Sequence, residues 1–247
     1  MNRIKSLICL SLMLVMGGQM MAQTHGTMFL GASFPMGNFN KVDGYYSTAL
    51  YGGQDAKFGG AGLGFNAGLK WDFGVGVPGL AVVLSVDGFY NGNSGDMKEC
   101  YKDYASGYDL LNRDIEQKYA QHINVPVMLG MRYTYYFNPQ LGLYAEGEVG
   151  GNGRFITPHV MKYTSLLGGV KHTDTERFNT AFTFAWQAGL GLEVSKNLVV
   201  GCSFYNLGSS EVKGTKTLKS DQGKVENDFE HGTLSPMMLL ARIGFRF

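Results

Sequence analysis

Apolar and polar residues alternate with a period of two along eight segments of the chain. The alternation is longest from Ile123 to Phe137, where every second residue is apolar. The other segments lie at 28–34, 63–73, 82–90, 141–149, 184–194, 198–204 and 239–247. Successive side chains of a β-strand point to opposite faces, so each segment predicts a strand with one apolar and one more polar face. Beyond residue 22 no apolar run reaches the ~18 residues of a membrane-spanning helix.

Short and long connections alternate strictly between these predicted strands. The short ones, rich in turn-forming residues, lie at 75–79, 138–140 and 195–197. The long ones are polar and lie at 36–58, 92–120, 154–180 and 209–234. Outer-membrane barrels have short periplasmic turns and long extracellular loops. The sequence therefore predicts an all-β fold, an eight-stranded antiparallel up-and-down transmembrane β-barrel with both termini in the periplasm.

Aromatic residues gather at the strand ends next to the short turns. They are Trp71, Phe73, Tyr135, Phe137, Phe245 and Phe247. Bulky and amphipathic rings are enriched where a barrel passes from lipid to water, so these six residues predict an interfacial girdle.

The strand faces opposite the apolar ones carry charged residues of both signs. These are Lys70, Asp72, Asp87, Arg132, Glu146, Glu148, Glu193, Arg242 and Arg246. The lumen of an eight-stranded barrel is just wide enough to be filled by side chains. Because buried charges are costly unless paired, we expect a salt-bridge and hydrogen-bond network that plugs a polar lumen. The alternative is that the same residues line a path for ions or protons.

The N-terminal residues have the three parts of a secretory signal peptide. Arg3 and Lys5 precede an apolar run at 7–16, and Ala22 provides a small residue for cleavage. Met20 departs from the small residue usual two positions before the cut-site alanine, so cleavage falls after Ala22 or within a residue or two of it. The predicted organisation is a signal peptide at 1–22 and an outer-membrane β-barrel domain at 23–247.

Composition excludes nucleic acid as a partner and leaves the cysteines open. The chain has 21 basic and 20 acidic residues, so it lacks the basic excess of a nucleic-acid-binding protein. Glycine (36 residues), tyrosine (14) and phenylalanine (16) are abundant, which favours strands and turns over disorder. Cys100 and Cys202 remain after the signal peptide, either as free thiols or as one disulfide.

No catalytic, metal or cofactor site is predicted. An outer-membrane enzyme acting on lipid needs a serine close to a histidine, with an acid to orient that histidine. The histidines are His25, His122, His159, His172 and His231, and none is paired with an outward-facing serine at a strand end. The spacing of His159 and His172 matches no zinc-ligand pattern.

Three segments resemble porin-family outer-membrane β-barrel domain proteins. They are 123–130, with an I-x-[IV]-P pattern, 189–194 before a short turn, and 34–37. The resemblance implies a small stand-alone barrel of the OmpX/OmpA type in a Gram-negative envelope, surrounded by outer-membrane lipid and lipopolysaccharide. It also implies that Phe245 and Phe247 form the terminal signal read by the barrel-assembly machinery, and that the barrel is a monomer.

The leading functional hypothesis is a non-enzymatic, porin-like barrel with a largely plugged lumen. Its long extracellular loops would serve surface interaction or envelope structure. Loop lysines such as Lys213, Lys216 and Lys219 are either solvated surface or a site for a host ligand, a matrix partner or lipopolysaccharide phosphates. Two alternatives remain: an outer-membrane lipid-modifying enzyme, and a soluble lipocalin-like binding barrel.

Overall fold

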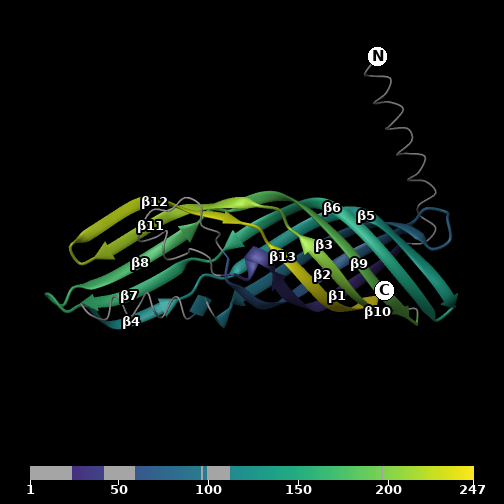
Figure 1. The fold of residues 1–247 in the computed structure, drawn as a ribbon, viewed down its shortest axis with the longest axis horizontal. Helices are drawn as coiled ribbons and strands as arrows, with labels where there is room; N and C mark the ends of the chain where they lie inside the picture. The colour runs from purple at the N-terminus through teal and green to yellow at the C-terminus, as the bar shows by residue number, and fades with distance from the viewer. Residues whose placement is uncertain (1–23, 42–58, 96, 99–111, 196) are drawn as a thin grey trace, which may run out of the picture.

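The computed structural model describes residues 24–41, 59–95, 97–98, 112–195 and 197–247 (Figure 1). The predicted signal peptide therefore lies outside the described residues. The elements are β1 (Thr24–Met36), η2 (Gly37–Phe39), β2 (Ala61–Gly74), β3 (Leu80–Asn93), β4 (Asn112–Lys118), β5 (His122–Asn138), β6 (Leu141–Ile156), β7 (His159–Ser165), β8 (Lys171–Phe178), β9 (Ala181–Val194), β10 (Leu198–Asn206), β11 (Ser210–Ser220), β12 (Gly223–Leu234) and β13 (Met237–Arg246). No helix in these described ranges is long and apolar enough to cross a bilayer.

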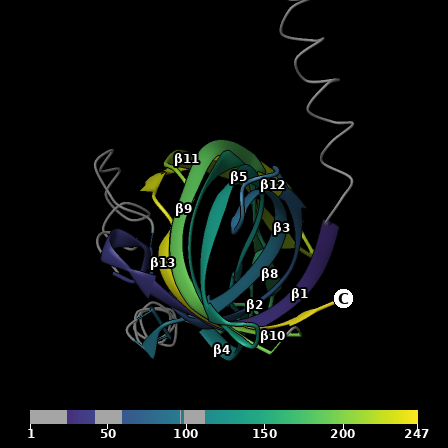
Figure 2. The same cartoon turned by 90° about the vertical axis from the view of Figure 1, so that its right-hand side faces the viewer.

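Eight strands form a closed antiparallel barrel in the order β1-β13-β10-β9-β6-β5-β3-β2 (Figure 2). They are the eight strands that the alternation predicts, so the predicted fold class is confirmed. The first and last strands close the barrel, with Met28 opposite Phe245 and Leu30 opposite Ile243. Beyond β13, the Gly26 and Phe247 backbones exchange hydrogen bonds of 3.1 and 2.8 Å. Both ends of the barrel domain thus lie beside the short turns.

The outside of the barrel is apolar and its inside holds the charged residues. On β5, for example, Leu129 is 55% exposed whereas its neighbour Met128 is 1% exposed. Outward-facing side chains from all eight strands include Leu30, Phe65, Val86, Leu129, Val149, Leu190, Val200 and Ile243. A soluble barrel would place its apolar residues inside and its charged residues outside. The observed faces are the reverse of that arrangement.

Five further strands form a second sheet in the order β12-β11-β8-β7-β4. This sheet, here called the outer sheet, projects from the end of the barrel opposite the short turns (Figure 1). Its strands lie within the predicted long segments 92–120, 154–180 and 209–234, for which the sequence predicted no strands. Apolar residues are too sparse there to give a clear period of two. The strands are held by threonine-rich and charged cross-strand pairs such as Thr217 with Glu226.

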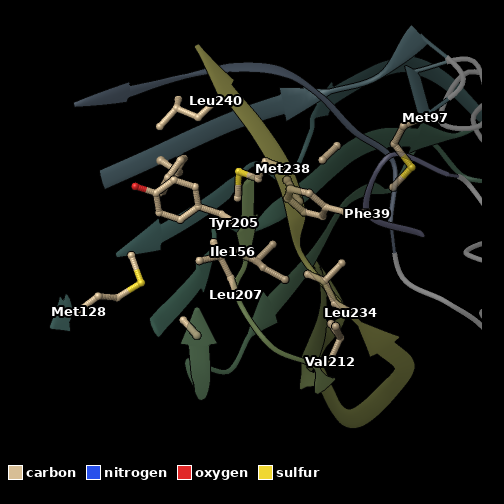
Figure 3. Close-up of a cluster of buried hydrophobic side chains, with 14 residues drawn as sticks. Phe39, Met97, Met128, Ile156, Tyr205, Leu207, Val212, Leu234, Met238 and Leu240 are labelled. Carbon is tan, nitrogen blue, oxygen red and sulfur yellow. The ribbon is translucent and has the colours of Figure 1, made fainter. Parts of the chain in front are cut away.

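A buried apolar cluster joins the barrel interior to the root of the outer sheet (Figure 3). Its members are Phe39, Ala61, Phe89, Met97, Ala120, Met128, Ile156, Ala185, Tyr205, Leu207, Val212, Leu234, Met238 and Leu240. The expectation of a polar interior along the whole barrel is therefore wrong at the end near the outer sheet. There Met128, Met238 and Leu240 are buried and belong to the same cluster as Phe39 and Leu207 of the connecting segments.

Candidate functional site

Glu146 of β6 lies at the centre of the charged side chains inside the barrel. Lys70 Nζ lies 2.6 Å from Glu146 Oε1, and Arg132 Nη2 lies 2.7 Å from Glu146 Oε2. Arg242 contacts the same carboxylate, and Gln187 donates to it at 3.1 Å. One buried carboxylate is thus shared by three cations from three other strands, β2, β5 and β13.

Glu148 and Asp87 extend the set from β6 and β3. Glu148 accepts from Lys70 at 2.5 Å, from Gln187 at 2.6 Å and from the Ser85 hydroxyl. Asp87 accepts from the Tyr205 hydroxyl at 3.0 Å, and Arg242 donates to that hydroxyl at 3.1 Å. Tyr205 therefore links Asp87 to the cations around Glu146.

A second group of charges lies nearer the short turns. Arg246 makes two hydrogen bonds to Glu193, at 3.0 and 2.5 Å. Arg132 lies 2.7 Å from Asp72, and Arg246 lies 3.5 Å from the same Asp72 oxygen. The Tyr136 hydroxyl donates to Glu193 at 3.0 Å. Because Arg132 contacts both Asp72 and Glu146, the two groups form one connected network, here called the lumen network.

All nine predicted lumen residues point inward and belong to the lumen network. Eight are buried, and the Arg246 side chain is 12% exposed. The sequence did not single out the neutral members Ser85, Tyr136, Gln187 and Tyr205. Uncharged polar residues occupy many inward positions of the barrel, so nothing in the pattern distinguished these four. Closure of the lumen to solutes by this network stays a prediction.

Two aromatic rings lie against arginines of the lumen network, and a glycine leaves space for one of these rings. The Arg132 guanidinium lies 4.5 Å from the centre of the Tyr144 ring, and Arg242 lies 4.5 Å from that of Phe29. Such cation–π contacts help to stabilise a desolvated guanidinium. A Cβ at Gly191 would lie 2.5 Å from the Tyr144 ring. A side chain at position 191 would therefore displace Tyr144 from its place beside Arg132.

A cavity of about 500 Å³ lies between the lumen network and the short turns. Its lining includes Asp72, Arg132, Glu193 and Arg246 of the network and residues 76–79 of the first short turn. The apolar cluster occupies the other end of the lumen. The barrel interior is therefore hollow on the side of the chain termini and packed on the side of the outer sheet.

Arg154 is a buried cation that the sequence did not single out. Its guanidinium donates to the backbone carbonyls of Ser210 at 3.3 Å and Glu211 at 3.0 Å. These carbonyls belong to the first residues of β11, where the chain leaves the barrel for the outer sheet. Arg154 thus fixes the root of the outer sheet on β6. Extending the alternation of the 141–149 segment by a few residues would have placed Arg154 on the inward face.

The outer sheet has a smaller charged cluster on β8 and β11. Lys216 Nζ lies 3.0 Å from Asp174 and 3.3 Å from Glu176. Burial raises the pKa of the Asp174 carboxyl, and the nearby Lys216 only partly opposes this shift. Burial lowers the pKa of Lys216, but the carboxylates of Glu176 and Asp174 outweigh it and leave the pKa raised. At neutral pH the charged lysine is therefore the counterion of two largely buried acids.

Replacing Lys216 with methionine should lower the free energy of local unfolding of β8 and β11 by about 1 kcal/mol. The value is modest because solvent screens this part-exposed lysine. Without the lysine, the folded-state pKa of Asp174 should rise further above its unfolded value. The loss of stability is then fully present above the raised pKa of Asp174, and it is relieved as the pH falls through that pKa. Hydrogen exchange of β8 and β11 amides measures both effects. Lys171→Met on β8 is the control, because Lys171 lies opposite Thr164 and has no ion pair with a described residue, and equal exchange in the two variants would contradict the assignment.

The described histidines lie beside aromatic rings, beside an acid or in the wall of the cavity. His122 is buried, with its ring edge-on to Phe39 at 5.3 Å between centroids. His159 Nδ1 lies 3.5 Å from Glu176, and His172 stacks on Tyr163 at 5.0 Å. His25 lines the 500 Å³ cavity. In the described ranges, no group of three or more His, Cys, Asp and Glu side chains is arranged to hold a metal ion.

The two cysteines have different outcomes. Cys202 is an exposed free thiol on the outer face of β10. This favours the predicted alternative of free thiols over a disulfide, whereas Cys100 itself lies outside the described residues.

Aromatic residues form a belt at each end of the barrel exterior. The predicted girdle is exposed at the short-turn end, with Tyr135 56%, Phe137 58%, Phe245 55% and Phe247 67% exposed and Trp71 and Phe73 half-buried. A second set faces outward near the outer sheet: Phe34, Phe65, Tyr90, Phe155, Phe182, Phe184, Trp186 and Phe204. The sequence predicted only the first set, because the strand ends beside the long connections were harder to place.

Comparison with known proteins finds similar solved structures. No protein-family model matches the chain, and no curated protein matches it. Ail of Yersinia pestis, solved with the heparin analogue sucrose octasulfate, has 15% identity and a TM-score of 0.41, covering 91% of this chain and 99% of Ail. A major outer membrane protein of Thermus thermophilus has 14% identity and a TM-score of 0.41, covering 91% and 100%. OprG of Pseudomonas aeruginosa has 12% identity and a TM-score of 0.38, covering 91% and 94%. The chain's own geometry defines its class, a closed eight-stranded antiparallel β-barrel with an apolar exterior.

Proposed function

We propose that this chain is an outer-membrane β-barrel protein without enzymatic activity, whose outer sheet carries its interactions. The observation that supports this most directly is the reversal of faces on a closed barrel. Lipid cannot satisfy unpaired backbone groups, so a sheet in a bilayer must close, and its outward side chains must be apolar. Both conditions are met here, with an aromatic belt at each end of the apolar surface.

The orientation follows from the lengths of the connections. Short turns of outer-membrane barrels face the periplasm. The start of β1 and the end of β13 lie beside those turns. We therefore assign both ends of the barrel domain to the periplasm and the outer sheet to the extracellular side. Phe245 and Phe247 are then the assembly signal, placed at the periplasmic rim.

The lumen supports a structural role in preference to solute passage. Lys70, Glu146 and Arg242 lie across its width with both signs of charge paired, and the apolar cluster fills the extracellular end. A narrow lumen crossed by paired charges and closed by apolar side chains offers no continuous aqueous path. The barrel is accordingly an anchor, and the outer sheet is the part that reaches other molecules.

Cell fractionation with a heat-shift gel tests the membrane assignment. The mature protein should be found in the outer-membrane fraction, and boiling should change its gel mobility. A protein that stays soluble and monomeric without detergent would contradict the assignment and favour a soluble lipocalin-like barrel. A change in lipid A species on deletion of the gene, measured by mass spectrometry, would instead indicate a lipid-modifying enzyme.

Conductance across planar bilayers tests the closed lumen separately. We expect no large, stable single-channel steps from the wild-type protein. Steps of that kind would show that the charged residues line a path and would overturn the structural role of the lumen network.

A further inference from the structure

The turn between β7 and β8 exposes two adjacent leucines at the tip of the outer sheet. Leu166 is 55% exposed and Leu167 is 79% exposed. Figure 1 shows this turn at the end of the molecule farthest from the short turns of the barrel. Gly168 and Gly169 follow with φ angles of +94° and +66°, which glycine adopts at little cost. The turn thus presents a small apolar surface at the most distant point from the barrel.

Hydrogen bonds within the turn hold the leucines in this position. The Ser165 backbone N–H donates to the Val170 carbonyl at 2.9 Å, and Gly169 N–H donates to the Ser165 carbonyl at 3.0 Å. The Ser165 hydroxyl donates to the Leu167 carbonyl at 3.2 Å. The backbone therefore has its own partners, and the leucine side chains are left facing solvent.

Four lysines lie on one face of the outer sheet, toward the end that carries this turn: Lys162 on β7, Lys171 on β8, Lys219 on β11 and Lys224 on β12. The strand register sets their common face. Lys224 lies opposite Lys219, Lys219 and Lys162 each lie opposite Thr173, and Lys171 lies opposite Thr164. Directly opposed residues of antiparallel strands share a face, as do residues two apart on one strand.

These lysines are only partly neutralised. Lys224 lies 2.8 Å from Glu226, and Lys162 lies 3.7 Å from Glu116. Lys171 and Lys219 have no ion pair with any residue that the structure describes. Lys219 and Lys224 lie directly opposite each other, which is an unfavourable like-charge pair that Glu226 offsets only through Lys224. The tip therefore combines an exposed apolar turn with two lysines, Lys171 and Lys219, that have no ion-pair partner among the described residues.

We propose that Leu166, Leu167 and these lysines form a docking tip for the surface of an anionic lipid bilayer apposed to the one that holds the barrel. Apolar side chains that enter the headgroup region and lysines that attract anionic headgroups are the two contributions to such binding. The lysines alone would also attract a soluble sulfated or phosphorylated polymer. The exposed leucines favour a bilayer, because only a bilayer also takes up apolar side chains. The proposal rests on the proposed function only in that the barrel itself occupies a membrane.

The test uses the full mature protein in phosphatidylcholine nanodiscs mixed with free vesicles. Sedimentation should show binding to vesicles that contain phosphatidylglycerol, little binding to vesicles of phosphatidylcholine alone, and weaker binding as salt is added. The double variant Leu166→Asn/Leu167→Asn should lower the affinity about tenfold or more, equivalent to 1.4 kcal/mol. Lys171→Gln/Lys219→Gln should lower affinity for the anionic vesicles and reduce its dependence on salt.

Val225→Asn is the matched control, because Val225 is 56% exposed on the same sheet but lies outside the turn. It should bind as wild type does, and all variants should keep the gel shift on boiling that reports a folded barrel. Equal binding to both kinds of vesicle, or unchanged binding by the leucine variant, would overturn the docking tip. A protein that fails to enter nanodiscs would refute the proposed membrane anchor instead, and the same vesicle assay on the free protein would still test the tip.

Discussion

Replacing Glu146 with glutamine should lower the free energy of unfolding of the barrel by about 3–5 kcal/mol, the usual cost of removing one partner from buried ion pairs. Glutamine keeps the volume of the side chain but removes its charge. Lys70 and Arg132 would retain Glu148 and Asp72 as partners. Arg242 would keep only the Tyr205 hydroxyl and the Phe29 ring among its described contacts. The largest part of the loss should therefore come from Arg242.

Denaturant titration in lipid vesicles, followed by the heat-shift gel, measures this loss. Glu226→Gln is the matched control, because it removes a carboxylate that pairs with Lys224 on the exposed surface of the outer sheet. Water and salt screen that pair, so the control should unfold as wild type does. In the double variant Glu146→Gln/Arg242→Met, the second change should cost much less than it does alone. Additive effects of the two changes would show that Glu146 and Arg242 are not coupled.

Replacing Leu129 with arginine should destabilise the protein by about 2–4 kcal/mol, because a charged side chain would face the middle of the bilayer. Leu129 lies near the centre of β5, opposite Leu84 of β3 and Val149 of β6, and all three point outward. The outward side chain of Leu129 is 55% exposed, so the change creates no clash inside the barrel. Any large loss of stability must therefore come from placing the arginine in contact with lipid.

Val225→Arg separates the effect of lipid from that of surface charge. Val225 is 56% exposed, almost the same as Leu129, but lies on the outer sheet. In water an arginine costs little at either position, so similar stabilities of the two variants would mean that the barrel exterior is not in a membrane. The comparison requires the same vesicle unfolding assay for both variants.

Together these experiments divide the molecule into three environments. The lumen network depends on paired and buried charges, the barrel exterior depends on lipid, and the outer sheet behaves as a water-exposed surface. The Lys216 variant and the docking-tip variants probe the third environment. A change in the outer sheet should therefore alter its own exchange or binding without altering the unfolding of the barrel.

The sequence by itself determined the barrel strands and their faces. The side-chain period of a strand is two, and a strand with lipid on one side and a filled lumen on the other shows that period in its residues. This is why Ile123 to Phe137 indicates both a strand and its inward residue Arg132. The same period identified Glu146 and Arg242 as inward-facing, and the alternation of connection lengths placed the chain ends beside the short turns.

Only the tertiary structure decided which inward residues meet and what covers the lumen. Glu146 lies 76 residues from Lys70 and 96 from Arg242, and no local pattern encodes contacts over such separations. The apolar end of the lumen is also a tertiary result, because Phe39 and Leu207 come from connecting segments. The outer sheet escaped prediction since its strands are exposed to water on much of their surface. Strands held by polar cross-strand pairs lack the apolar alternation on which sequence reading depends.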